Sequence, residues 1–150
     1  MNGHACSLAL ALAALAATWG CAGDGTGLDE FGSPLGGGQQ WPNPFAPTLS
    51  AIQANIFTPI CTQCHTGASA PQGLALDAGV ARPDLVGVRS AELPALMRVS
   101  PGKPDSSYLV WKIEGRSGIV GAQMPLGLPP LSGNQIAAVR GWILAGALQN

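Results

Sequence analysis

Apolar residues recur at helical spacing near the middle of the chain. Over residues 49–60 they stand three or four positions apart, which places one apolar stripe along a helix, at Leu49, Ile52, Ile56 and Ile60. The spacing predicts a helix over residues 49–57. Thr48 or Ser50 can cap its start, because a side-chain oxygen there can accept a free backbone N–H. Pro59 has no backbone N–H, and we expect it to break or kink the helix.

Two shorter helices are predicted further along. Residues 77–85 form one, with Asp77 as its cap and Pro83 as an interruption. Residues 107–114 form the other, and either residue before it, an Asp or a Ser, can act as the cap. Between these helices the segment is rich in Pro and Gly, which favours turns and extended backbone.

A final amphipathic helix is predicted over residues 133–145, because Ile136, Val139, Ile143 and Ala147 share one helical face. Ser132 with Gln135 forms a capping-box pattern at its start, and Gly146 can end it. No internal repeat and no convincing strand pattern occurs in the chain. The predicted fold class is therefore all-α.

The N-terminal segment has the pattern of an export signal. Residues 8–17 are a ten-residue apolar run, too short for a transmembrane helix and typical of a signal-peptide core. Residues 1–20 followed by Cys21 resemble a bacterial lipoprotein signal, in which the cysteine is lipidated and becomes the new N-terminus. Trp19 and the lack of Lys or Arg before the run depart from that pattern. The alternative is ordinary cleavage nearby, which leaves Cys21 as a free thiol.

Residues 21–47 have the composition of a flexible tether. Seven Gly and four Pro fall within this stretch. Such a segment cannot bury enough apolar surface to offset the entropy lost on ordering. Trp41 and Phe45, near its end, either fold back onto the domain that follows or face solvent. With a lipid on Cys21, the tether would hold that domain away from a membrane surface.

Composition limits the classes of function that need to be considered. Only 10% of the residues are charged and the formal net charge is −1, so no nucleic-acid partner is indicated. Aromatic residues make up 5% of the chain, and the 150 residues suffice for one domain of roughly 100 residues with extensions. A core built from the polypeptide alone would be thin.

One pentapeptide carries a specific chemical signal. Residues 61–65 read Cys-Thr-Gln-Cys-His, the C-x-x-C-H pattern of covalent c-type haem attachment. Residues three and four apart share one face of a helical turn. Cys61 and Cys64 can therefore each form a thioether with the haem, while His65 reaches the iron from the same side.

A zinc site and a redox dithiol are the alternatives to haem for this pentapeptide. A structural zinc site needs four ligands, usually as two separated pairs, and the remaining Cys and His residues all stand in the N-terminal segment, at His4, Cys6 and Cys21. A thioredoxin-like dithiol belongs to a βαβ pattern, and no strand-rich run precedes the motif. Haem attachment is the favoured interpretation.

A haem iron held by one histidine has a second axial position. Met124 follows His65 by 59 residues and lies in a Gly- and Pro-rich stretch between two predicted helices. A loop is not restricted to helical side-chain directions and suits a thioether ligand, so we expect Met124 to be the sixth ligand. Met97 stands in a more apolar setting, where core packing is its expected role.

Taken in order, these features resemble the class I cytochrome c fold, in which the first and last helices cross beside the haem. More narrowly, the chain resembles the planctomycete-type cytochrome c domains of exported bacterial proteins. The residues that carry this likeness are Arg98-Val99, Pro101-Gly102, Pro104, Ser107-Tyr108-Leu109-Val110, Gln123-Met124-Pro125, Leu131-Ser132, Trp142-Ile143 and Gly146-Ala147. The likeness covers residues 48–149, and we assign residues 48–150 to the cytochrome c domain. It implies one covalent haem c, His65 and Met124 as ligands to the iron, and electron transfer.

Other polar and aromatic residues have less specific expected roles. Arg98, Lys103 and Tyr108 are candidates to bind the haem propionates, with solvated surface positions as the alternative. Trp111 and Trp142 are expected to line the haem crevice or the helix crossing. A glycine beside Trp142, at position 141, would let two helices approach closely.

The sequence thus predicts a periplasmic or cell-envelope electron carrier, not an enzyme, tethered to a membrane by a lipid on Cys21. Its partners would be the redox proteins of an electron-transport chain. One alternative is a haem-based sensor or haem enzyme in which Met124 is a labile ligand. Another is a non-redox surface lipoprotein whose haem is structural.

Overall fold

The computed structural model describes residues 45–150, and the predicted signal peptide, Cys21, Trp41 and most of the tether lie outside this range. Within it the chain is helical and forms no strand, so the predicted all-α class is confirmed there. The elements in order are α1 (Leu49–Ile52), η1 (Gln53–Phe57), α2 (Thr58–Ile60), η2 (Cys61–Gln63), η3 (Pro71–Gly73), α3 (Ala81–Leu85), η4 (Pro104–Ser106), α4 (Tyr108–Glu114) and α5 (Gly133–Leu144).

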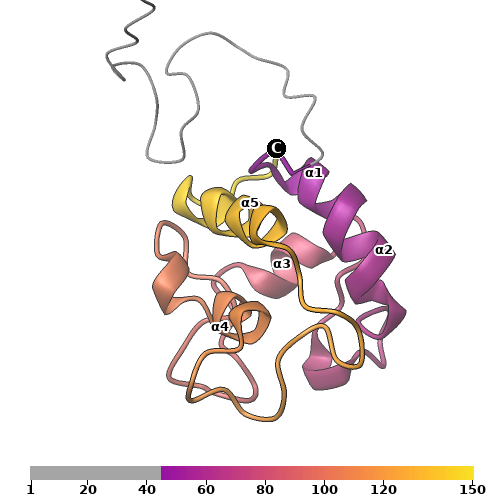
Figure 1. The fold of residues 1–150 in the computed structure, drawn as a ribbon, viewed down its shortest axis with the longest axis vertical. Coiled ribbons are helices and arrows are strands. Elements are labelled where there is room, and N and C mark those ends of the chain that lie inside the picture. The colour runs from indigo at the N-terminus through magenta and orange to yellow at the C-terminus, as the bar shows by residue number, and fades with distance from the viewer. Residues whose placement is uncertain (1–44) are drawn as a thin grey trace, which may run out of the picture. The chain divides into compact units, whose positions relative to one another are not determined.

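The first helical path runs from α1 to η2 without interruption (Figure 1). Thr48 caps it, because its hydroxyl oxygen accepts the N–H of Ala51 at 3.2 Å. The break expected at Pro59 does not occur. In a regular α-helix a proline ring meets the carbonyl four residues earlier. Here η1 is a wider π-turn, in which the N–H of Thr58 bonds to the carbonyl of Gln53, and helical structure continues to Ile60.

The predicted cap at Asp77 is wrong. Helix α3 begins only at Ala81, and no side chain caps it. The carboxylate of Asp77 instead accepts hydrogen bonds from the hydroxyl of Thr66 at 2.5 Å and the N–H of Gly67 at 2.9 Å. Pro83 lies inside α3, within the first turn, where a helix leaves backbone N–H groups unpaired anyway.

Helix α4 lacks the cap predicted from the two residues before it. Asp105 and Ser106 form the 3-10 turn η4, and Ser107 is the first non-helical residue before α4. The hydroxyl of Ser107 is used elsewhere: it donates to the carbonyl of Lys103 and accepts the N–H of Ser100, both at 2.9 Å. These bonds join the Pro- and Gly-rich turn to the start of α4.

Helix α5 agrees with its sequence pattern. It covers Gly133–Leu144, and both hydrogen bonds of the Ser132–Gln135 capping box are present. Its backbone turns out of the helix at Gly146, whose φ of +97° is one that L residues rarely adopt. The predicted end at this glycine is therefore confirmed.

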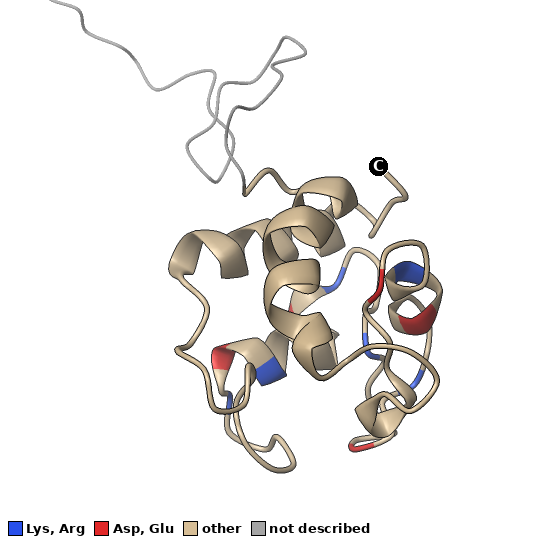
Figure 2. Ribbon diagram, turned by 90° about the vertical axis from the view of Figure 1, so that its right-hand side faces the viewer, with Lys and Arg blue, Asp and Glu red and all other residues tan. Residues whose placement is uncertain are grey.

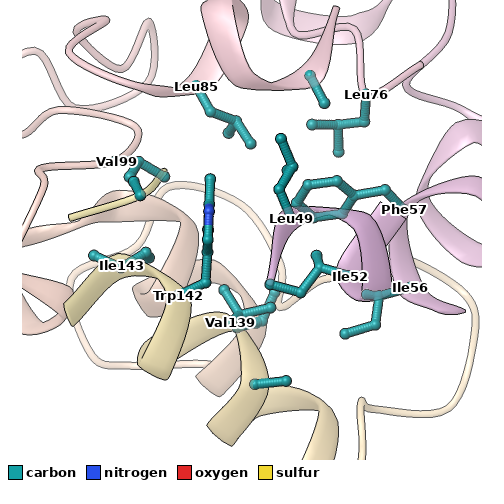
Figure 3. Close-up of a cluster of buried hydrophobic side chains, with 14 of the residues drawn as sticks. Leu49, Ile52, Ile56, Phe57, Leu76, Leu85, Val99, Val139, Trp142 and Ile143 are labelled. Atoms are coloured by element: carbon teal, nitrogen blue, oxygen red, sulfur yellow. The ribbon is translucent and has the colours of Figure 1, made fainter. Parts of the chain in front are cut away.

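Helix α5 packs against both α1 and α4. Trp142 is fully buried at the centre of this packing, and in the view of Figure 3 its ring stands between Val99 and Leu49. Its indole Nε1–H donates to the carbonyl of Leu148 at 2.8 Å. At Gly141 an added Cβ would lie 2.8 Å from Cβ of Pro47, so this glycine has a packing role, but the close approach is to the segment before α1 and not to a second helix.

The two ends of the described chain meet beside α1 (Figure 1). The side-chain and main-chain oxygens of Asn150 accept the N–H groups of Leu49 and Ser50 at 2.9 and 2.8 Å. These are among the N–H groups that a helix start leaves unpaired. Phe45 packs against the core and Ala46 is buried, so the packed structure begins slightly before residue 48.

Charged residues are few along the ribbon (Figure 2). Arg116 and Arg140 both pair with Asp105 and Glu114, at distances between 2.6 and 3.1 Å, which links η4, α4 and α5. Among residues 45–150, no helix has the length and hydropathy needed to cross a membrane.

Candidate functional site

A cavity of about 360 Å³ opens beside α4 and the end of the first helical path. Its size falls within the roughly 300–1,000 Å³ typical of cofactor sites. Cys61, Cys64 and His65 line it from one segment, and Met124 lines it from another. The rest of the lining is mainly aliphatic and includes Leu74, Leu76, Leu85, Leu109, Ile113 and Leu131.

The two cysteines stand on a tight helical turn. The N–H groups of Cys64 and His65 both bond to the carbonyl of Cys61, at 3.2 and 2.9 Å. The side chains of Thr62 and Gln63 donate to carbonyls of the preceding helix, one turn back, at 2.6 and 2.9 Å. The turn is thereby fastened to the helix before it, and all three functional side chains reach the same cavity.

The two thiols differ in their surroundings. Cys61 is half-buried and packs against the core, whereas Cys64 is exposed. Burial removes water from the Cys61 sulfur and raises its thiol pKa to about 11, because a thiolate is disfavoured there. Of the two sulfurs that line the cavity, that of Cys64 is therefore the more accessible to solvent and that of Cys61 the more buried.

His65 is oriented by the segment of chain that follows it. Its ring nitrogen Nδ1 lies 3.0 Å from the carbonyl oxygen of Leu74, and its own carbonyl accepts the N–H of Leu76 at 2.8 Å. A carbonyl can only accept, so Nδ1 is the donor in this contact, and in the neutral imidazole Nε2 is then the nitrogen with the lone pair. Gln53 holds this segment to η1, because its amide donates to the carbonyl of Leu76 at 2.8 Å.

Met124 is presented from a loop that is tied to α4. Its N–H donates to the carbonyl of Lys112 at 2.8 Å, and the amide of Gln123 donates to the carbonyl of Ile113, also at 2.8 Å. The peptide bond between Met124 and Pro125 is cis. Met97 does not line the cavity and is half-buried elsewhere, consistent with the packing role expected for it.

A polar cluster that no sequence pattern indicated forms part of the cavity wall. Glu92, Tyr108 and Lys112 all line the cavity, and Lys112 lies 3.0 Å from the Glu92 carboxylate. Burial is the main cause that raises the pKa of the Tyr108 phenol, and the adjacent Glu92 adds to it. Glu92 lies in an irregular segment, 20 residues before Lys112, and no local sequence pattern predicts that these two residues pair.

The other predicted site residues divide into two groups. Arg98 and Tyr108 line the cavity, whereas Lys103 is exposed away from it. The guanidinium of Arg98 donates to two carbonyls, those of Asp84 and Gln72, at 2.8 and 2.6 Å.

Neither tryptophan with an expected site role lines the cavity. Trp142 is a core residue at the crossing of α5. Trp111 donates its Nε1–H to the carbonyl of Asp105 at 2.7 Å and lies beside the guanidinium of Arg116. These side chains were expected at the haem crevice or at the helix crossing. Trp142 lies at the helix crossing, and neither tryptophan lies at the cavity.

Among residues 45–150, no group of three or more His, Cys, Asp or Glu side chains is arranged to hold a metal ion. The predicted lipidation residue, Cys21, lies outside the described residues. Comparisons with known protein families, curated proteins and solved structures found no match for this chain.

Proposed function

We propose that this protein is a one-electron carrier with a single covalent haem c. Cys61 and Cys64 would hold the haem as thioethers, and His65 and Met124 would be the axial ligands of its iron. One observation carries the proposal: two segments 59 residues apart in the sequence bring a C-x-x-C-H motif and a methionine to the same apolar cavity.

The chemistry of the residues around the cavity fits this group. Bonding of Nδ1 to the Leu74 carbonyl leaves Nε2 of His65 as a neutral ligand atom, the arrangement found for histidines that bind metals. The thioether of Met124 is uncharged and most of the other lining residues are aliphatic, which suits a flat apolar ring. When bound, the haem supplies a one-electron iron couple whose potential a His/Met ligand pair raises.

The protein's own groups favour transfer of electrons over binding of substrates. With His65 and Met124 both bound to the iron, no coordination position would remain for a substrate. Each ligand is anchored by a backbone hydrogen bond, at 3.0 Å for the His65 ring and 2.8 Å for the Met124 N–H. Rigid ligands reorganise little on oxidation and reduction, which suits a carrier.

We further infer the class I cytochrome c fold for residues 48–150. The order of elements and the packing of α5 against α1 support this assignment, since that fold crosses its first and last helices beside the haem. The pattern of residues 1–20 supports export, with a lipid on Cys21 and a periplasmic or cell-envelope location. The partners proposed are redox proteins of an electron-transport chain.

Optical spectroscopy of protein expressed with a periplasmic haem-attachment system tests the proposal. We expect covalent haem and, in the oxidised protein, a sulfur-to-iron charge-transfer band. Met124→Leu should abolish the band, while Met97→Leu, the matched control, should keep it. A colourless protein would overturn the haem assignment. Rapid carbon monoxide binding to the reduced wild type would favour a sensor or enzyme, and failure to exchange electrons with a redox protein would favour a structural haem.

A further inference from the structure

We call the segment between α4 and α5, residues 115–132, the methionine loop because it contains Met124. Two side chains of α4 bind both backbone polar groups of one of its residues, Val120. The Nζ of Lys112 donates to the carbonyl of Val120 at 2.8 Å. The N–H of Val120 donates to the hydroxyl of Tyr108 at 2.9 Å. Glu92 joins the two side chains, because its Oε2 accepts from Lys112 at 3.0 Å and from Tyr108 at 2.9 Å. We call Glu92, Tyr108 and Lys112 the clamp.

The clamp is shielded from solvent, unlike an ordinary surface ion pair. The side chains of Lys112 and Glu92 are 9% and 19% exposed, and Tyr108 is buried. The ammonium of Lys112 also lies 5.9 Å from the centre of the Tyr108 ring, within the range of a cation–π contact. Partly buried charges that lose a partner are left without full solvation, so removal of one member weakens the others.

The clamp and the Met124 anchor act on the same short segment. Val120 precedes Met124 by four residues, and Lys112 binds both: its side chain binds Val120 and its carbonyl binds the Met124 N–H. The segment 120–124 is therefore fastened to α4 at both ends. Val120 itself is largely exposed, so its side chain contributes little to holding the loop.

We propose that the clamp is a positioning device for the axial methionine. By fixing Val120 to α4, it limits the conformations of the loop to those that keep the Met124 thioether at the cavity. Clamp residues hold no iron and carry no electron; they act through Met124. The inference rests on the proposed function, since it assigns a purpose to the loop geometry only if Met124 is a ligand.

Tyr108→Phe is the sharpest test, because it removes only the hydroxyl that binds both Val120 and Glu92. Lys112→Leu is a second variant that removes the ammonium, keeps an aliphatic side chain and the backbone carbonyl, and adds no sulfur to the cavity. Arg140→Gln is the matched control: it removes two ion pairs on α5, to Asp105 and Glu114, from a residue that does not line the cavity. The haem-loaded protein would be measured in all four forms.

In Tyr108→Phe and Lys112→Leu we expect loss of most of the sulfur-to-iron band with covalent haem retained. Carbon monoxide should bind the reduced variants at least about tenfold faster, because loss of a hydrogen bond to a charged or buried group raises loop opening by that order. Arg140→Gln should lower the unfolding temperature and leave band and binding rate unchanged.

Amide hydrogen exchange provides a readout that does not depend on the optical band. In haem-loaded protein, the Val120 N–H should exchange about tenfold faster in Tyr108→Phe than in wild type. If the wild type shows the band and both clamp variants keep it unchanged, the clamp proposal is wrong and His/Met ligation is unaffected. A wild type that carries haem but no such band would overturn His/Met ligation, and the clamp's role with it.

Discussion

The Nδ1 atom of His65 lies 3.0 Å from the carbonyl oxygen of Leu74, nine residues later in the chain. This contact decides which nitrogen of the imidazole is available to a metal. The contact requires the chain after the C-x-x-C-H turn to fold back toward His65. Asp77 stabilises this loop, because its carboxylate accepts hydrogen bonds from Thr66 and Gly67, just after the motif.

The first prediction concerns Asp77 and pH. The hydrogen bonds from Thr66 and from the Gly67 N–H hold the pKa of Asp77 below its ordinary value. Because the folded pKa is lowered, the ionised carboxylate stabilises the fold fully above the unfolded pKa of about 3.9, and this contribution is lost as pH falls through the folded pKa. Asp77→Ala should therefore unfold more easily than wild type at pH 7, and the gap should shrink in acid.

Unfolding by urea at a series of pH values measures this gap. Thr66→Val removes the largest cause of the lowered pKa and should show a smaller gap with the same direction of pH dependence. A gap between wild type and Asp77→Ala that stays constant from pH 7 down to about 2 would mean that the carboxylate does not stabilise this loop.

The second prediction concerns the approach of α5 to the segment before α1. A methyl group at Gly141 would lie 2.8 Å from Cβ of Pro47, so Gly141→Ala should cost about 1–3 kcal/mol of unfolding free energy. Gly133→Ala is the control in the same helix, since nothing lies within 4 Å of the added methyl. It should leave stability unchanged or slightly raised. Equal losses in both variants would contradict the close approach.

The sequence predicted the structure best where the residues that form a pattern all lie within one element. The spacing of Ile136, Val139 and Ile143 and the Ser132–Gln135 pair were enough to predict α5 and its first turn. The C-x-x-C-H motif likewise identified three cavity residues, because its side chains share one turn.

Contacts between distant segments could not be predicted in this way. Asp77 was expected to cap a helix, but its carboxylate bonds to a loop ten residues earlier. The clamp joins an irregular segment, a helix and a loop, and neither Glu92 nor Lys112 belongs to a periodic pattern that points to the other. Pro59 was expected to break or kink the helix, and the wider turn of η1 allows the helix to continue without a break.

The third prediction separates the two tryptophans. Trp142→Phe leaves the Leu148 carbonyl without its donor and leaves space in a fully buried site, so it should cost about 2–4 kcal/mol. Trp111→Phe removes a similar bond, to the Asp105 carbonyl, at a half-buried position open to water. That variant should cost about 1 kcal/mol or less. Denaturant unfolding of both proteins measures the difference, and a reversed order would contradict the placement of Trp142 in the core.

The fourth prediction concerns Gly115, which ends α4 in a left-handed conformation with φ of +67°. A methyl group there would lie 2.7 Å from Oε1 of Gln123, the residue whose amide binds the Ile113 carbonyl and precedes Met124. The Gln123 side chain can move aside only by giving up that hydrogen bond. Gly115→Ala should therefore combine a backbone cost of about 1–2 kcal/mol with about 1 kcal/mol for the lost bond.

Gly127→Ala separates these two contributions. Gly127 has a similar φ of +73° in the same loop, with open space around an added methyl group, so only the backbone cost applies. Unfolding free energies should differ by about 1 kcal/mol between the two variants. Because Gln123 holds the loop next to Met124, the sulfur-to-iron band expected for the proposed haem ligation should weaken in Gly115→Ala and persist in Gly127→Ala. Equal stabilities and equal bands would show that Gln123 does not anchor the methionine loop to α4.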